Sequence, residues 1–256
     1  MDFRIYKPQG KLADHIQAIW SVSVSEKQAA AEQKLLFSDA GTGIMFNLGC
    51  DIVWGELPQP MGVVLESVSP KAQAVLLPPG TVLAGIRFHP AMGFSFLGKR
   101  YGQAVQAEDD PEHARALQAL QAQLVNSTGH QGRISRIYRW LIQSMDVQQA
   151  SHDAISGIMK AVHSHDESRT LPVSTRQIER HFQKWLGITP KHYQRILRVR
   201  NTIDVIRTTP DINLAELAVT QGFSDQAHMT REFSAIACIT PRQFSQRVKQ
   251  SIARIQ

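Results

Sequence analysis

The pattern of hydrophobic and polar positions divides the chain into a strand-rich part followed by a helical part. Over about the first 100 residues, short apolar runs alternate with turns that contain glycine or proline, a pattern typical of antiparallel β-strands. The predicted strands are IQAIWSVSV (16–24), KLLF (34–37), GIMFNLG (43–49), DIVWG (51–55), GVVLESV (62–68), AVLLPPG (74–80) and VLAGIRFHP (82–90). We therefore expect a mainly antiparallel β domain, whose core includes the aromatic residues Trp20, Phe37, Phe46, Trp54 and Phe88.

The period of the apolar positions changes after Asp109. Two amphipathic runs, 111–125 and 132–145, are separated by the polar stretch NSTGHQ. One apolar face is formed by Leu117, Leu120 and Leu124, and the other by Ile134, Ile137, Leu141 and Met145. The spacing predicts two helices, and the acidic run DDPE (109–112) suits a helix start, where the dipole favours negative charge. Such a pair suits an interdomain connector or a self-association surface.

A motif occurs twice in the last hundred residues. RHFQKWLGITPKHY (180–193) and REFSAIACITPRQF (231–244) both fit Arg-x-Phe-x5-Ile-Thr-Pro-x2-[Tyr/Phe]. In each copy the threonine is a good N-cap, and the proline falls at the first helical position, where its missing N–H costs nothing. The preceding isoleucine and the following aromatic residue match a hydrophobic staple. Each copy is therefore predicted to end one helix and begin another.

The helix that precedes the first Ile-Thr-Pro is predicted to be strongly amphipathic. Ser174 is its expected N-cap, with Gln177 as capping-box partner. Ile178, Phe182, Trp185 and Leu186 form an inward stripe, and Gly187 is a natural stop. The outward positions are Thr175, Arg176, Glu179, Arg180 and Gln183.

The second copy lies in a fuller helix-turn-helix pattern. Leu214, Leu217 and Ala218 line a short helix, Gly222 breaks it, and Ser224 is the expected cap of the next helix. Met229, Phe233, Ile236 and Ala237 point inward in this second helix. Gln226, Ala227, His228, Thr230, Arg231 and Ser234 are predicted to lie on or beside the outer face. Cys238 replaces the glycine of the first copy, so we expect this helix to end differently.

Charge separates the two parts of the chain. Residues 1–150 hold 13 basic and 13 acidic side chains, whereas residues 151–256 hold 15 and 9, which is the whole net charge of +6. A neutral part joined to a basic part indicates that one part docks on a polyanion. Polar side chains on the exposed face of a helix can read base edges in the major groove of DNA.

The second copy, GFSDQAHMTREFSAIACITPRQF, closely resembles the signature of AraC-type (AraC/XylS) transcription regulators. STRQIERHFQKWLGITPKHYQRILRVR resembles that family's first helix-turn-helix and joining helix. The resemblance covers about residues 151–249. It implies two recognition helices in successive major grooves of double-stranded DNA, joined here by residues 190–206.

The resemblance also implies which residues face the DNA. Carried over by position, the set from the first recognition helix is Thr175, Arg176, Glu179 and Arg180. The set from the second is Gln226, Ala227, His228 and Arg231. One departure concerns the first unit: where the family has a supporting helix, this chain has HSHDESRTLPVS (163–174), with Pro172 and no apolar stripe.

The N-terminal part also resembles a known domain. YKPQGKLADHIQAIWSVSV, FSDAGTGIMFNLG and GIRFHPAMGFSFLG are similar to the cupin-like β domain of a subset of AraC-type regulators, whose ligand is generally undefined. We expect no metal, because the histidines His15, His89, His113 and His130 form no HxH pattern. His89 is expected to be structural, next to the turn marked by Pro90 and Gly93. His152, His163 and His165 lack a usable fourth ligand.

Other kinds of chemistry find no support in the sequence. No nucleophile motif, P-loop, dinucleotide fingerprint or paired carboxylates stand out, so no catalytic residue and no cofactor is predicted. The two cysteines, Cys50 and Cys238, lie far apart and suit a reducing compartment. The chain has no run of about 18 apolar residues, and its first residues lack the layout of a secretion signal. We therefore expect a cytoplasmic protein, and the resemblance to AraC-type regulators implies a bacterial one.

These observations predict an α+β protein in three parts. Residues 1–105 would form an antiparallel, cupin-like effector or interaction domain, residues 106–150 a helical connector, and residues 151–256 an all-α tandem helix-turn-helix domain. The expected function is sequence-specific regulation of transcription. Expected partners are DNA, RNA polymerase, a small-molecule or protein effector and a second copy of the chain. The alternatives are a cupin-like enzyme with an appended DNA-binding domain and a protein-interaction module.

Overall fold

The computed structural model describes residues 1–144, 149–164 and 174–253. The chain divides into two compact units. The first contains Met1–Leu35, Ala40–Val68 and Ala74–Gly187, and the second contains Leu36–Asp39, Ser69–Gln73 and Ile188–Gln256. The domain boundaries predicted from the sequence, near residues 105 and 150, stay predictions.

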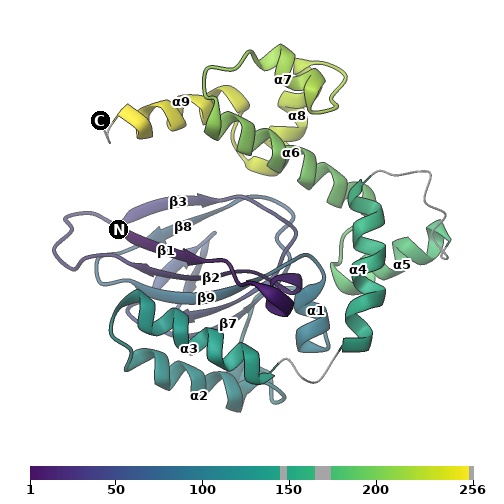
Figure 1. Ribbon diagram of the computed structural model, residues 1–256. Helices are drawn as coiled ribbons and strands as arrows, with labels where there is room; N and C mark the ends of the chain where they lie inside the picture. The colour runs from purple at the N-terminus through teal and green to yellow at the C-terminus, as the bar shows by residue number, and fades with distance from the viewer. Residues whose placement is uncertain (145–148, 165–173, 254–256) are drawn as a thin grey trace. The chain divides into compact units, whose positions relative to one another are not determined.

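A six-stranded antiparallel sheet forms the centre of the first unit (Figure 1). Its strands in spatial order are β1 (Asp2–Tyr6), β2 (Ile16–Ser23), β9 (Val82–Phe88), β4 (Gly43–Asn47), β7 (Gly62–Glu66) and β10 (Val105–Gln106). The central strand β4 is buried at all five positions, because the sheet is covered on both faces. Its sequence, GIMFN, accordingly has no polar residue until its end.

A second, four-stranded sheet supplies the other layer of a β-sandwich. Its order is β3 (Glu32–Leu36), β8 (Gln73–Leu77), β5 (Ile52–Trp54) and β6 (Leu57–Gln59). A core cluster joins side chains of both sheets, among them Val22 and Met45 from the first and Ile52 and Val75 from the second. Each of the seven predicted strand runs overlaps a strand of the sandwich, so the prediction of an antiparallel β domain is confirmed.

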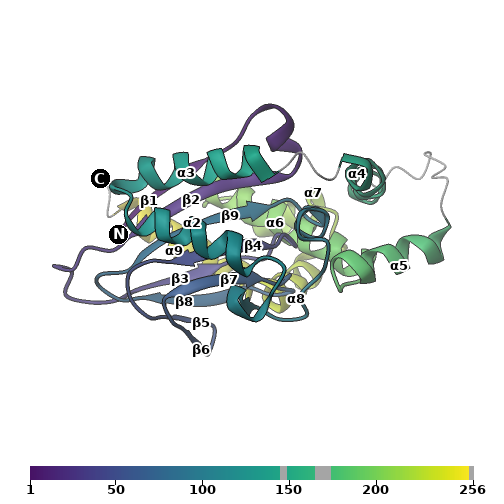
Figure 2. The same cartoon turned by 90° about the horizontal axis from the view of Figure 1, so that it is seen from below.

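Two helices cover the outer face of the six-stranded sheet (Figures 1 and 2). They are α2 (Ala114–Val125) and α3 (Gly129–Ser144), as the sequence predicts. The buried residues Leu117, Leu120 and Leu124 of α2 and Ile137 and Leu141 of α3 belong to the predicted stripes. Met145, the last residue of the second stripe, lies outside the described residues.

The sequence pattern missed several short elements. They are β1, β6, β10 and the helix α1 (Met92–Leu97), together with two 3₁₀ turns, Gly10–Asp14 and Ala107–Asp109. The pattern indicated only a turn around Pro90 and Gly93, but α1 begins directly after it. Ala91 takes a left-handed conformation with φ +67° at the N-terminus of α1, and Gly98 takes one with φ +72° at its end. Six residues are too few to show a helical period.

The helices α4 (Gln149–Ser164) and α5 (Thr175–Trp185) complete the first unit. Helix α4 buries Ile155, Ile158, Met159 and Val162. A helix with an apolar face therefore does precede α5, although it lies upstream of the stretch 163–174 that the sequence comparison placed there. His163 is exposed near the end of α4, and His165 and Pro172 lie outside the described residues.

Helices make up the C-terminal part of the second unit. They are α6 (Pro190–Thr208), α7 (Leu214–Thr220), α8 (Gln226–Ala237) and α9 (Pro241–Ala253). Their core contains Tyr193, Ile196, Val199, Ile203 and Ile206 of α6 together with Leu217, Met229, Phe233 and Phe244. Every described residue from 190 to 253 lies in a helix or in a short connection between helices, which confirms the predicted all-α class of this region.

Candidate nucleic-acid interface

Helix α5 begins with the predicted capping box. The Ser174 hydroxyl oxygen accepts a hydrogen bond from the Gln177 backbone N–H, and the Gln177 side chain accepts one from the Ser174 N–H at 2.7 Å. Phe182 and Trp185 are buried on the inner face, as predicted. The outer face carries Thr175, Arg176, Glu179 and Arg180, all of them exposed. These four side chains are free to meet a partner on one surface of the helix.

His181 lies beside this surface and stacks on Trp185, with 4.6 Å between ring centroids. Burial lowers its pKa, and the neighbouring charges of Arg180 and Lys184 lower it further. The imidazole therefore favours its neutral form, so the positive charge of this part of α5 comes from Arg176, Arg180 and Lys184.

The second helix-turn-helix unit is formed by α7, a turn and α8. Asn213 caps α7, and Gly222 takes the left-handed conformation, with φ +74°, that the predicted turn requires. The cap of α8 differs from the prediction. It is Asp225 rather than Ser224, since the Asp225 carboxylate accepts the hydrogen bond of the His228 N–H at 2.6 Å. A carboxylate is favoured there by the helix dipole.

The outer face of α8 has a different composition from that of α5. Gln226, Ala227 and Arg231 are exposed, as predicted. His228 is only half-buried, and its ring is engaged within the protein. Its Nδ1 lies 3.1 Å from the Ser224 hydroxyl, and its ring contacts Phe223 edge-on. Ser224 therefore orients His228 instead of capping the helix.

Glu232 is the residue at this site that the sequence analysis missed. Its side chain is 14% exposed, and its Oε1 accepts a hydrogen bond from Arg195 Nε of α6 at 2.8 Å. Arg198 of α6 and His228 of α8 each place a nitrogen 3.7 Å from the carboxylate. The carboxylate therefore ties α8 to α6 beside the residues of its outer face. The only sign of Glu232 in the sequence was its position as an acidic residue directly before the predicted core residue Phe233.

The repeated Ile-Thr-Pro performs the same task in both copies. Thr189 accepts a hydrogen bond from the His192 N–H, and Thr240 accepts one from the Gln243 N–H. Gly187 ends α5 with φ +71°, and Cys238 ends α8 with φ +56°. The expectation that Cys238 would change the ending was wrong: the cysteine adopts the left-handed conformation despite its side chain.

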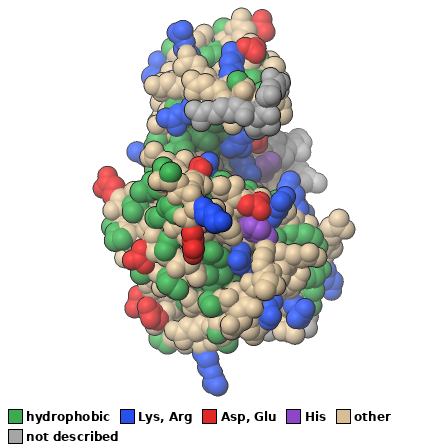
Figure 3. Space-filling view, turned by 90° about the vertical axis from the view of Figure 1, so that its left-hand side faces the viewer, with side chains coloured by type: hydrophobic (Ala, Val, Ile, Leu, Met, Phe, Trp, Pro, Cys, Tyr) green, Lys and Arg blue, Asp and Glu red, His purple; other side chains and the backbone are tan. Residues whose placement is uncertain are grey.

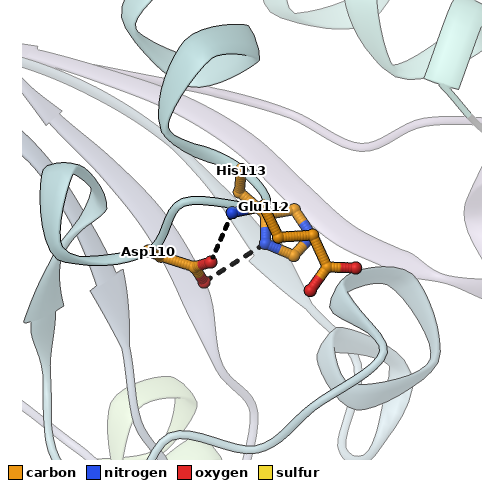
Figure 4. Close-up of side chains that lie close together, drawn as sticks. All are labelled: Asp110, Glu112 and His113. Carbon is orange, nitrogen blue, oxygen red and sulfur yellow. Dashed lines mark hydrogen bonds and ion pairs between the residues drawn. The ribbon is translucent and has the colours of Figure 1, made fainter.

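An acidic cluster in the first unit has the composition of a metal site. Asp110, Glu112 and His113 place one ligand atom each within 4.8 Å of one another (Figure 4). Asp110 is only 3% exposed, but its carboxylate already accepts hydrogen bonds from Lys99 Nζ at 2.8 Å and from the Tyr101 hydroxyl. The ammonium group of Lys99 therefore already neutralises the buried carboxylate of this cluster.

The same bonds explain the electrostatics of the cluster. Burial alone would raise the pKa of Asp110, but the hydrogen bonds from Lys99, Tyr101 and His113 outweigh it and hold the pKa below its usual value. Asp110 also accepts a hydrogen bond from the Glu112 backbone N–H, shown in Figure 4. The DDPE run therefore centres on a buried ion pair rather than only on helix-start charges.

Comparison with known proteins agrees with the C-terminal geometry. Residues 168–247 match the family model of a helix-turn-helix domain. No curated protein matches the chain. Among solved structures, ToxT from Vibrio cholerae O395 shares 7% identity over 90% of this chain and 96% of its own, with a TM-score of 0.42.

Two ligand-bound structures of ToxT are similar to the same extent. ToxT from strain O395 bound to (E)-4-(8-methylnaphthalen-1-yl)but-3-enoic acid shares 7% identity over 97% of this chain and 100% of its own, with a TM-score of 0.45. Unsaturated-fatty-acid-bound ToxT from Vibrio cholerae strain SCE256 shares 10% identity over 89% and 93%, with a TM-score of 0.40. Similarity at this level is too low to transfer a ligand to this chain.

The family match and the local geometry define the class of the C-terminal region. It is a helix-turn-helix domain, a kind of domain that transcription regulators use to bind DNA. More closely, it is a helix-turn-helix region of the AraC type. Among the described residues, no helix is long and apolar enough to cross a membrane.

Proposed function

We propose that this protein is a sequence-specific transcription regulator that inserts α5 and α8 into successive major grooves of double-stranded DNA. The observation that carries the proposal is the paired construction of the two helices. Each is capped by a side chain at its N-terminus, anchored by a buried phenylalanine, and closed by a left-handed residue before Ile-Thr-Pro. Each also presents a short polar surface on its outer side.

The side chains on these two surfaces suit direct readout. Arginine pairs with guanine and glutamine with adenine in the major groove, where both form bidentate hydrogen bonds. We assign base contacts to Arg176 and Arg180 of α5 and to Gln226 and Arg231 of α8. Thr175, Glu179 and Ala227 would lie at the same surfaces. His228 would contribute by fixing the start of α8, since its ring is engaged by Ser224.

Helix α6, which joins the two helix-turn-helix units, has a length that suits binding to two major grooves. Helix α6 has 19 residues, which corresponds to about 28 Å at a rise of about 1.5 Å per residue. Successive major grooves on one face of B-DNA are about 34 Å apart. A joining helix of this length supports the proposal that α5 and α8 bind two successive major grooves.

We assign a sensing or interaction role to the N-terminal β domain. Residues 1–150 have no net charge, whereas residues 151–256 carry all of the excess positive charge. A neutral domain gains little from the phosphate backbone, which dominates affinity for DNA. The effector is a small molecule or a protein that this domain recognises.

An enzyme with an appended DNA-binding domain is the alternative. Its best candidate site among the described residues is the cluster of Asp110, Glu112 and His113. The bonds of Asp110 to Lys99 and Tyr101 argue against a catalytic metal there. We therefore favour a regulator without catalytic activity.

The test is selection of binding sites by the full-length protein from a random duplex library, followed by affinity measurements on the selected site. We expect Arg180→Ala and Arg231→Ala each to cost about 1–3 kcal/mol of discrimination at defined base pairs. Arg139→Ala is the matched control, because it removes the same charge from an exposed position of α3. Equal loss in all three variants would show that only general electrostatics is involved.

A further inference from the structure

Strand β1 lies at an open edge of the six-stranded sheet. Among the described residues, β2 is the only strand that pairs with it, from Asp2 opposite Ser23 to Tyr6 opposite Ile19. All five residues of β1 are exposed. An edge strand presents a row of unpaired backbone donors and acceptors, which another strand can extend.

The two faces of β1 differ in what covers them. Tyr6 packs edge-on against Tyr138 of α3, and Asp2 lies 3.4 Å from His130 of the same helix. Because side chains alternate along a strand, Phe3 and Ile5 face the opposite way. They are 46% and 53% exposed.

Phe3 and Ile5 continue an apolar surface that begins in the core. Phe3 is paired with Val22 and Ile5 with Trp20 across the strands. Val22 belongs to the core cluster between the sheets, and Trp20 packs against it. The apolar inner face of the six-stranded sheet therefore extends from β2 onto β1, beyond the residues of the core cluster. Figure 3 shows hydrophobic side chains exposed between charged ones on one face of the molecule.

The charges of β1 are self-complementary. Arg4 Nε lies 3.3 Å from the Asp2 carboxylate, and both side chains are more than half exposed. In an antiparallel pair of two such strands centred on Phe3, the aspartate of each copy would lie opposite the arginine of the other. A pair centred on Arg4 would instead place the two Arg4 side chains opposite each other, which is unfavourable. Of these two registers, the charges favour the one centred on Phe3, which pairs Asp2 with Arg4 at both ends.

We propose that β1 pairs with β1 of a second copy of this chain, antiparallel and about a two-fold axis at Phe3. The six-stranded sheets of the two copies then form one continuous sheet, and the partner covers part of the apolar surface of Phe3 and Ile5. This self-association surface depends on the β domain alone and does not rest on the proposed DNA-binding function.

The geometry also sets the expected strength. Five paired residues bury less than the roughly 1,200 Å² of a standard stable interface, and Pro8, which lacks an N–H, lies two residues beyond the end of the strand. We therefore expect a dimer that forms with increasing concentration. Binding of two copies to neighbouring sites on one molecule would raise their effective concentration and favour the pair.

A charge exchange tests the register in the full chain. By sedimentation velocity, Asp2→Arg and Arg4→Asp should each reduce dimerisation at least 10-fold, because each places like charges opposite each other. An equimolar mixture of the two variants should form mixed dimers again, since two arginines in one chain then meet two aspartates in the other. Circular dichroism checks that each variant is folded. The proposal is overturned if the mixture of the two variants forms no more dimer than each variant alone, or if the wild-type protein stays monomeric at all concentrations.

A cross-link tests the position of the axis. In a Cys238→Ser background, Phe3→Cys should form an intermolecular disulfide, because residues opposite each other in an antiparallel pair have Cα atoms about 4.5–5.5 Å apart. Ile5→Cys should cross-link to itself at least 10-fold more slowly, since the two cysteines would lie on opposite sides of the axis. Equal rates for the two variants would contradict the register.

Discussion

At the scale of single residues, the two phenylalanines of the repeat and the two arginines that precede them have separate tasks. Phe182 and Phe233 are fully buried, whereas Arg180 and Arg231 are exposed. Phe182→Ala and Phe233→Ala should each reduce the free energy of unfolding by about 3–5 kcal/mol, because each leaves a cavity. The arginine changes should alter it by less than about 0.5 kcal/mol. Denaturant titration of the four variants measures these changes. A larger loss of stability in the arginine variants would mean that the inward and outward faces of α5 and α8 are assigned the wrong way round.

Glu232 should stabilise the contact between α8 and α6 through its ion pairs with Arg195 and Arg198. Glu232→Gln removes the charge that pairs with Arg195 and Arg198. We expect a loss of about 1–3 kcal/mol of stability, and a weaker preference for the selected DNA site, because α8 is no longer fixed to α6. Glu216→Gln, on the exposed side of α7, is the control. If binding and stability both stayed at the wild-type level, Glu232 would have no positioning role.

Asp110 should make stability depend on pH in the acid range. Because its folded pKa lies below the unfolded value of about 3.9, its contribution is fully present above that value and is lost as the pH falls towards the folded pKa. Asp110→Asn should therefore destabilise the protein by about 1–3 kcal/mol at pH 7. The difference from wild type should narrow below about pH 4. A difference that did not change with pH would assign the effect to packing.

At the scale of elements, the two ends before Ile-Thr-Pro allow a matched comparison. Gly187 and Cys238 both have left-handed backbones, but only glycine adopts this conformation without strain. Gly187→Ala should destabilise the protein by about 1 kcal/mol, and Cys238→Gly should stabilise it by a similar amount. Thermal or denaturant unfolding measures both. Changes of the same sign would mean that the surroundings of the two residues, rather than the backbone, decide.

The elements that the sequence predicted are the ones with a strong local signal. Strands such as β4 and helices such as α2 have long apolar patterns that match their burial. β1 has no such signal, because all its residues are exposed and only its pairing with β2 makes it a strand. The cap at Asp225 was missed because Ser224 and Asp225 are both good caps, and only the position of the turn distinguishes them.

The candidate interface shows the same limit. The outward positions of α5 and α8 follow from the helical period, so they could be read from the sequence. The engagement of His228 by Ser224 and of Glu232 by Arg195 depends on how the turn and α6 pack against α8. Contacts between residues 37 positions apart, such as the one between Arg195 and Glu232, have no signature in a local pattern.

At the scale of the whole molecule, two recognition helices of one chain are proposed to bind one DNA molecule at a fixed spacing. Binding should weaken steeply with salt, by about 10³-fold between 50 and 200 mM if about six phosphates are contacted. The N-terminal domain should leave the preferred sequence unchanged, since it carries no net charge. Two helices that read successive grooves should also require a fixed spacing between their half-sites.

That spacing gives the most direct measurement of the central claim. The full-length protein would be titrated onto its selected site and onto two variants, with about 5 or about 10 base pairs inserted between the half-sites; one turn of B-DNA has about 10.5 base pairs. We predict that both insertions reduce affinity at least 10-fold, because in the proposed arrangement the single helix α6 would hold the two recognition helices at one spacing. Unchanged affinity for either variant would show that the protein reads one groove, and would contradict the account.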